Sequence, residues 1–209
     1  MKSIILVGAV AAVLAGYKQF NSESSAFQVD KAASKIEWYG ATPDHSHIGS
    51  FDVTGGIDLS SEGRVKGGEF TIPVASIVDY DLPDPVRQTL LEDLKSANFF
   101  NMVKYPETKF KITKVGAYGG VDTSYVADAN YLLTGDFTML GQTHSITFPA
   151  HIRTVNDSLV TDAKFNLDRT KWGMKMYSDP KQKLYIYPNV KISLHVKAAK
   201  TAKGETAKL

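Results

Sequence analysis

The chain has 209 residues, of which 43% are hydrophobic and 22% charged, and these values are close to those of an average globular protein. They argue against a wholly disordered chain, a multi-pass membrane protein and a collagen-like fibre. Lysine and arginine total 24 and aspartate and glutamate total 22, while the absence of cysteine excludes disulfides, thiolate metal sites, iron–sulfur clusters and cysteine nucleophiles.

The basic excess lies at the two ends of the chain. Residues 1–26 carry a net charge of +1 and residues 199–209 a net charge of +2, so the part between them carries −1. A nucleic-acid-binding protein usually has a basic stripe on its folded domain. We therefore expect no nucleic acid among the partners.

The first 26 residues are typical of an export signal followed by a short spacer. Lys2 precedes an apolar run over residues 4–15, which is too short to cross a bilayer as a helix. Small residues at Ala15 and Ala26 offer two cleavage sites for a secretory signal peptide. Tyr17 stands where a bacterial lipoprotein would need cysteine. We expect a periplasmic or secreted protein, with an uncleaved apolar terminus as the alternative.

The next part of the chain consists of short runs in which apolar and polar residues alternate. Alternation is typical of a strand with one face in the core, and repeated short strands predict an antiparallel sandwich or barrel. The predicted strands cover residues 27–29, 35–39, 51–59, 65–72, 108–114, 125–139, 144–152, 158–167 and 190–196.

The same alternation places the large apolar side chains on one face of each strand. Phe70 and Ile72, for example, alternate with Glu69 and Thr71. In a sheet that closes into a barrel, this face lines a common interior, which is filled either by its own side chains or by a ligand. The sequence leaves both alternatives open. The interior candidates are Trp38, Phe51, Phe70, Ile72, Phe110, Phe137, Phe148, Phe165 and Leu167.

One segment has the spacing of a helix. Val86, Leu90 and Leu94 lie four residues apart, and Asp84 and Pro85 suit the helix cap and the first helical position. The spacing predicts an amphipathic helix over residues 84–94, which acts either as a lid on the barrel or as fixed packing. We expect one domain over residues 27–198 and a disordered tail over residues 199–209.

Several sequence motifs follow one another in a characteristic order along residues 27–198. They are Phe27-Gln-Val-Asp30 with Ser34-Lys-Ile-Glu-Trp38, Ser46-His47-Ile-Gly49, Gly67-Gly68-Glu-Phe70, Leu94-Lys-Ser-Ala-Asn-Phe-Phe100 with Tyr105-Pro-Glu-Thr-Lys-Phe110, Leu133-Thr-Gly-Asp-Phe-Thr-Met-Leu-Gly141 with Ile146-Thr-Phe-Pro149, and Asp168-Arg169-Thr-Lys-Trp172-Gly173. In this order they resemble the YceI-like family of exported bacterial proteins. The resemblance implies an all-β fold, an extended antiparallel lipocalin-like barrel of about eight strands with one inserted helix.

The resemblance also implies a function. Barrels of this family hold a long polyisoprenoid, such as an isoprenoid quinone or a prenyl phosphate, and have no agreed catalytic residues, cofactor or metal. We therefore expect non-catalytic binding or transport of such a lipid in the bacterial envelope. The expected partners are the isoprenoid lipid, transient membrane contact and a homodimer formed through an exposed strand edge. The alternatives are an enzyme acting on a lipid-like substrate, with His144 or His47 as its titrating group, and a structural envelope protein with a side-chain-filled core.

Two polar residues are candidates for contact with a lipid head group. His47 follows His45 at a spacing that also suits zinc, with Asp44, His144 or His151 as further ligands, but a hydrogen-bonded or solvated histidine pair is the favoured interpretation. Arg169 is either an anion clamp or part of a salt-linked turn with Asp168, in which Trp172 closes one end of the barrel; the turn is favoured. For Asp79, Asp81 and Asp84 we expect a solvated acidic loop rather than a weak calcium site.

Overall fold

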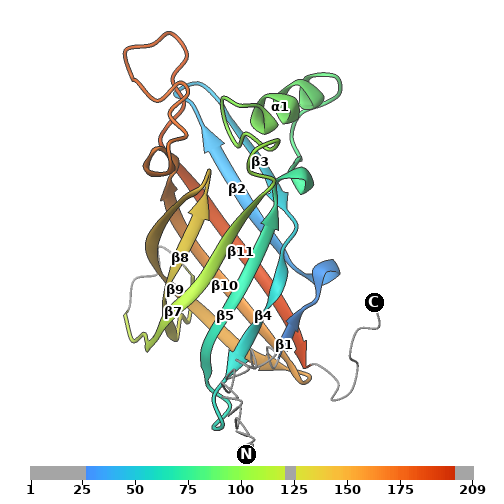
Figure 1. Cartoon of the computed structure of the whole chain (residues 1–209), viewed down its shortest axis with the longest axis vertical. Helices are drawn as coiled ribbons and strands as arrows, with labels where there is room; N and C mark the ends of the chain where they lie inside the picture. Colours follow the sequence, from blue (N-terminus) through green and yellow to red (C-terminus); the bar gives the residue numbers. More distant parts are fainter. Residues whose placement is uncertain (1–26, 121–125, 201–209) are drawn as a thin grey trace, which may run out of the picture.

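The computed structural model describes residues 27–120 and 126–200, which form one long barrel with a helix at one end (Figure 1). The described strands are β1 (Phe27–Val29), β2 (Lys35–Ala41), β3 (Ser46–Phe51), β4 (Thr54–Leu59), β5 (Val65–Pro73), β6 (Val78–Asp79), β7 (Glu107–Ala117), β8 (Tyr131–Met139), β9 (Gln142–Val155), β10 (Ser158–Asp168) and β11 (Asn189–Lys200). The described helices are α1 (Val86–Lys95) and the 3₁₀ helices η1 (Lys31–Ala33), η2 (Val74–Ser76) and η3 (Arg169–Trp172).

All the described strands belong to one antiparallel sheet that closes on itself. The ring runs β1-β4-β5-β7-β8-β9-β10-β11 and returns to β1, where Phe27 pairs with Lys200. Further along the barrel, β2 pairs with β11 and β3 with β2, so β1 with β2 and β3 with β4 act as two interrupted barrel strands. The closed eight-stranded barrel with a single α-helix confirms the all-β, lipocalin-like fold expected from the sequence.

Closure of the ring removes most free strand edges. Among the described strands, the two-residue β6 remains at one end of the sheet order. The homodimer expected through an exposed edge therefore rests on a short edge, and it stays a prediction.

The prediction of a single strand over residues 51–59 is wrong, because the strand is interrupted between the end of β3 at Phe51 and the start of β4 at Thr54. Gly55 has a φ of +131°, and a Cβ atom there would lie 2.1 Å from the carbonyl oxygen of Glu69. Only glycine allows this close crossing of two strands. The break also turns Val53 into the core, where its side chain is fully buried.

The helix differs from its prediction at its start. It begins at Val86, because Asp84 does not cap it: the Asp84 carboxylate instead accepts hydrogen bonds from the side chains of Arg87 and Gln88. Leu91 is the buried residue of α1, with Leu90 and Leu94 beside it, whereas Val86 is 54% exposed. The predicted stripe was thus wrong at Val86, and α1 packs with its second and third turns.

Two strand ends also differ from expectation. The strand predicted from residue 125 begins at Tyr131, because the side chain of Asn130 forms both hydrogen bonds to the backbone of Ile152 and ends the ladder. At the other end of the chain, β11 continues through Lys200, two residues into the predicted tail, since Ala199 pairs with Gln28 and Ser158. The predicted signal peptide and residues 201–209 lie outside the described residues.

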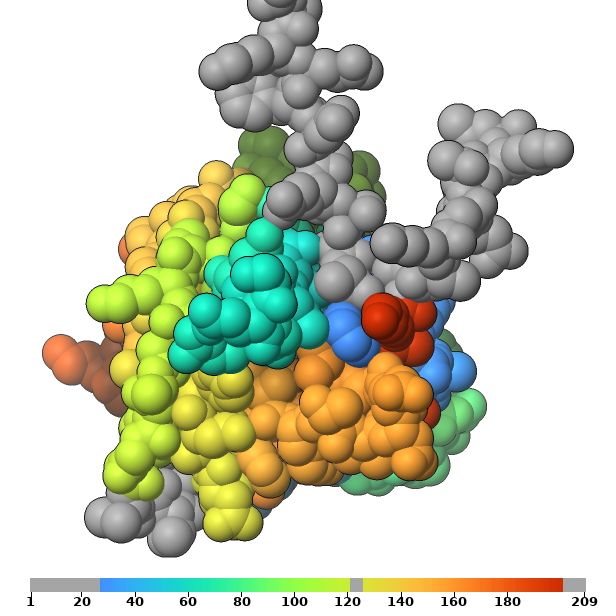
Figure 2. All heavy atoms as spheres, turned by 90° about the horizontal axis from the view of Figure 1, so that it is seen from below, coloured from blue at the N-terminus to red at the C-terminus, as the bar shows by residue number. Residues whose placement is uncertain are grey.

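The barrel is filled with side chains at the end opposite α1. Phe27, Ala150, Leu159 and Ala198 belong to one buried cluster there. Figure 2 views the molecule from this end. Where grey atoms do not cover it, the β4–β5 turn (teal) lies next to the β9–β10 hairpin (orange). This end therefore anchors the barrel, and the space for a ligand lies further along it.

Candidate functional site

A cavity of about 380 Å³ lies inside the barrel. Its size falls within the range of small-molecule sites, roughly 300–1,000 Å³. Every strand of the closed ring except β1 contributes to its wall, and β2 and β3 complete it. The alternation along the strands assigned nine apolar residues to the interior, and all of them line this cavity: Trp38, Phe51, Phe70, Ile72, Phe110, Phe137, Phe148, Phe165 and Leu167. Their contact with a ligand stays a prediction.

A row of aromatic rings forms one wall of the cavity. Phe148 of β9 stacks on Phe165 of β10 with ring centroids 4.3 Å apart, and lies 5.6 Å from Phe110 of β7. Phe110 in turn faces Phe70 of β5 at 6.4 Å, because the two residues are direct partners in the β5–β7 ladder. Such a wall offers large apolar contact and no hydrogen-bonding group, so it suits a hydrocarbon chain.

Most of the polar lining residues lie at the end of the barrel that carries α1; Thr161 of β10 is an exception deeper in the cavity. There the cavity is bordered by the β2–β3 turn, by Asp93 of α1 and by the segment 173–188, which are together called the mouth end (Figure 1). His45, Ser46 and His47 come from the β2–β3 side. The site is thus largely apolar in depth and polar at its opening, which is the pattern that an amphiphilic molecule requires.

Arg169 is the buried cation of this site. Arg169 is 4% exposed, and its guanidinium donates hydrogen bonds to the carbonyl oxygens of Met174 at 2.7 Å and Ile186 at 3.0 Å. It thereby ties both ends of the segment 173–188 to η3. Burial lowers the pKa of Arg169 from its usual value.

The predicted salt link between Asp168 and Arg169 is wrong. The Asp168 carboxylate accepts hydrogen bonds from the backbone and the hydroxyl of Thr170, while the guanidinium turns inward and lines the cavity. Trp172 closes the wall beside it: its ring is 1% exposed, and its Nε1 donates to the carbonyl oxygen of Phe137 at 2.9 Å. Within the described ranges, Arg169 forms no ion pair, and its Nε atom has no hydrogen-bond partner.

Two further buried polar atoms face the cavity without partners in the described part of the chain. They are Nε1 of Trp38 and Oγ1 of Thr161, and both residues line the cavity. Buried polar atoms are rarely left unpaired, so each is a place where a polar ligand atom would be stabilised. The sequence analysis missed Thr161, although it shares the inward parity of Phe165 and Leu167, and this alternation was the available signal.

The histidine pair at the mouth end separates into two different environments. His45 Nδ1 lies 3.0 Å from the Thr42 hydroxyl, whereas His47 Nδ1 lies 3.2 Å from the carboxylate Oδ2 of Asp81. Asp81 also accepts a hydrogen bond from the backbone of Ile48. Burial tends to raise the pKa of Asp81, but the hydrogen bonds from Ile48 and His47 outweigh it and hold this pKa below its usual value.

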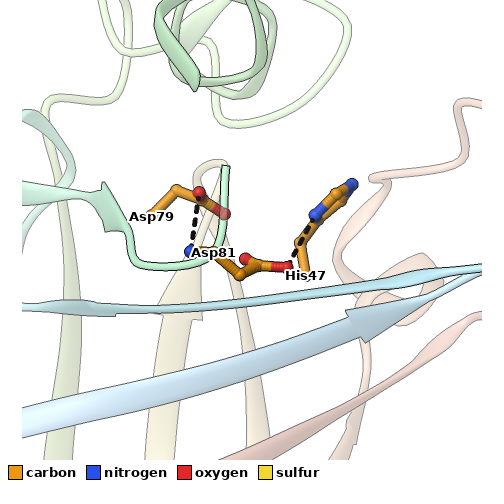
Figure 3. A group of neighbouring side chains, drawn as sticks. All are labelled: His47, Asp79 and Asp81. Carbon is orange, nitrogen blue, oxygen red and sulfur yellow. Dashed lines mark hydrogen bonds and ion pairs between the residues drawn. The ribbon is translucent and has the colours of Figure 1, made fainter. Parts of the chain in front are cut away.

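Asp79 completes a group that sequence reasoning did not assemble (Figure 3). One ligand atom from each of His47, Asp79 and Asp81 lies within 4.8 Å of the others. The further zinc ligands considered from the sequence, Asp44, His144 and His151, are not part of this group.

The placement of His144 corrects one sequence interpretation. Parity assigned it to the barrel interior, but it is exposed and packs against the ring of Trp172, with centroids 5.1 Å apart. Its strand partner Phe137 does line the cavity, but the ring of Trp172 packs edge-on against both Phe137 and His144. His144 is therefore not the interior titrating group that the enzyme alternative requires.

Comparison with known proteins decides the family. The family model described as YceI-like domain matches residues 27–198. This chain belongs to the YceI-like family. No curated protein matches the sequence.

Solved structures share the fold of this YceI-like protein. The BcnA structure from Burkholderia cenocepacia has 19% sequence identity and a TM-score of 0.65, over 82% of this chain and 99% of that one. A polyisoprenoid-binding domain from Saccharophagus degradans, implicated in plant cell wall breakdown, has 12% identity and a TM-score of 0.63, over 85% and 100%. The Campylobacter jejuni YceI protein has 21% identity and a TM-score of 0.56, over 74% and 85%.

The described part of this YceI-like chain contains no helix that is both long enough and apolar enough to cross a membrane.

Proposed function

We propose that this YceI-like protein binds an amphiphilic polyisoprenoid, of the isoprenoid quinone or prenyl phosphate type, and carries or shields it in the bacterial envelope without catalysis. The observation that carries this proposal is the cavity: it is largely apolar along the barrel and polar at the mouth end. Membership of the YceI-like family supports lipid binding, as does the likeness to a structure named as a polyisoprenoid-binding domain.

The energetics favour a long hydrocarbon ligand. Each methylene removed from water is stabilised by about 0.8 kcal/mol, so a long isoprenoid binds through apolar contact alone. The head group would lie at the mouth end, where His47 and the buried Arg169 border the cavity. The position of the exposed His144 gives the enzyme alternative less support, and the open cavity gives less support to a wholly side-chain-filled core.

Export is part of the same proposal. The basic start and short apolar run of residues 1–26 support a periplasmic or secreted location. An exported carrier would bind its lipid outside the cytoplasm.

Lipid extraction tests the proposed function directly. We expect the full-length protein, purified from its native envelope and extracted with organic solvent, to release about one isoprenoid lipid per chain in mass spectrometry. The lipids should form a series that differs by whole isoprene units. A lipid-free extract from a folded, monodisperse sample would contradict the proposal.

We further propose that the mouth end makes transient contact with a membrane. Among the described residues, all but one of the exposed large hydrophobic side chains lie at this end. The exception is Val155, in the β9–β10 hairpin at the opposite end. Those at the mouth end are Ile48, Val78, Tyr80, Val86, Val103, Leu184 and Tyr187. Val103 is 96% exposed. Apolar side chains around an opening suit a surface that meets the acyl chains of a bilayer.

Replacing Val103 with glutamate is expected to slow lipid transfer between vesicles by several-fold, because a carboxylate at this position opposes insertion among acyl chains. A fluorescence transfer assay with anionic donor and acceptor vesicles measures the rate. Val155→Glu is the matched control, since it makes the same change at the other end of the barrel. Equal slowing by both variants would count against docking through the mouth end.

A further inference from the structure

A polar cluster lies at the mouth end, where β3 meets the segment that follows β6. His47 lies on β3, Asp79 ends β6, and Asp81 follows two residues later, so the short β3–β6 pairing brings the three side chains together. In Figure 3 one carboxylate oxygen of Asp79 is bonded to the backbone of Asp81, and the other points toward the Asp81 and His47 side chains.

The Asp79 carboxylate is only half satisfied. Its side chain is 3% exposed, and its Oδ1 accepts hydrogen bonds from the backbone of Asp81 at 3.3 Å and of Leu82 at 2.9 Å. Its Oδ2 is buried and has no hydrogen-bond partner among the residues described. A buried carboxylate oxygen without a partner is costly, and a cation beside it would remove that cost.

The remaining two groups supply ligands of the right kind. His47 presents an imidazole nitrogen and Asp81 a carboxylate oxygen, and the three ligand atoms already lie within 4.8 Å of one another. The side chains of His47 and Asp81 are 23% and 37% exposed, so an ion can reach them from solvent. An ion would displace the single hydrogen bond that now joins them.

We propose that His47, Asp79 and Asp81 bind a divalent transition-metal ion of the zinc type at the mouth of the cavity. Imidazole favours zinc and its neighbours over calcium, which takes about six to eight oxygen ligands. Three protein ligands leave at least one coordination position open, as in zinc sites that also hold water or a bound molecule. The proposal departs from the expectation from sequence that the chain holds no metal.

Zinc titration of the full-length, chelator-treated protein tests the site. Isothermal titration calorimetry should give about one zinc ion per chain. His47→Gln and Asp79→Asn should each weaken binding by at least about tenfold, since even groups that only support metal ligands commonly contribute this much. The visible absorption of the cobalt-loaded protein should change in both variants, because the ligand set changes.

The controls separate this site from adventitious binding. Asp84→Asn removes a carboxylate three residues from Asp81 that bonds Arg87 instead, and it should leave zinc affinity unchanged. His47→Gln alters a partly exposed side chain, so it keeps the test open if Asp79→Asn does not fold. Unchanged zinc affinity in folded His47→Gln, or tighter binding of calcium than of zinc by the unmodified protein, would overturn the proposal. Neither result depends on whether a lipid is bound.

Discussion

Replacing Phe148 with aspartate is expected to abolish lipid retention. Phe148 is 3% exposed, stacks on Phe165 and lines the cavity where the aromatic wall is densest. A carboxylate there would have to be desolvated by the bound hydrocarbon, which costs several kcal/mol and corresponds to a loss of affinity of about 100-fold or more. The measurement is lipid per folded chain, by solvent extraction and mass spectrometry.

Thr147→Asp is the matched control for this variant. Thr147 precedes Phe148 on β9 and is exposed on the outside of the barrel, so the same new charge should leave lipid retention unchanged. Circular dichroism and gel filtration establish that both variants fold. Normal retention by a folded Phe148→Asp protein would show that the ligand does not occupy this part of the cavity.

Arg169→Met is expected to cause the largest loss of stability at the mouth end. The substitution removes two hydrogen bonds that a charged group donates, so the carbonyl oxygens of Met174 and Ile186 lose this donor. The cost is about 3 kcal/mol, which for a domain of this size lowers Tm by roughly 6–12 °C. Hydrogen exchange should increase over the segment 173–188, which the guanidinium ties to η3.

Lys171→Met is the control for Arg169, because Lys171 is an exposed cation two residues along the same 3₁₀ helix. It should change neither Tm nor hydrogen exchange. Arg169→Lys keeps the charge but lacks the planar fork that reaches both carbonyl groups, so we expect it to behave like Arg169→Met. Wild-type Tm and exchange in Arg169→Met would contradict the anchoring role.

Alternation in the sequence was enough to predict the wall of the cavity. A strand has a side-chain period of two, so Phe110, Phe148 and Phe165 are assigned to one face by their neighbours alone. Closure of the sheet then directs that face inward for every strand. This local rule explains why residues from separate strands were correctly grouped before their pairing was known.

The mouth end could not be predicted in the same way. His47 meets Asp81 across 34 residues of sequence, and only the short pairing of β6 with β3 brings them together. The inward turn of Arg169 likewise depends on carbonyl groups of a segment without regular structure. His144 failed for a related reason: it pairs with the cavity residue Phe137, but its ring packs against Trp172, which comes from η3, and stays exposed.

The seam of the barrel has a consequence for when the protein can fold. β1 and β11 close the ring, and Ser34 and Lys197, which bond each other beside this seam, are 163 residues apart. The barrel therefore cannot close until β11, near the end of the chain, has been synthesised. Contacts between such distant residues form slowly, because the loop between them must first be ordered. Late closure keeps the chain unfolded during synthesis, which would suit the export that we propose.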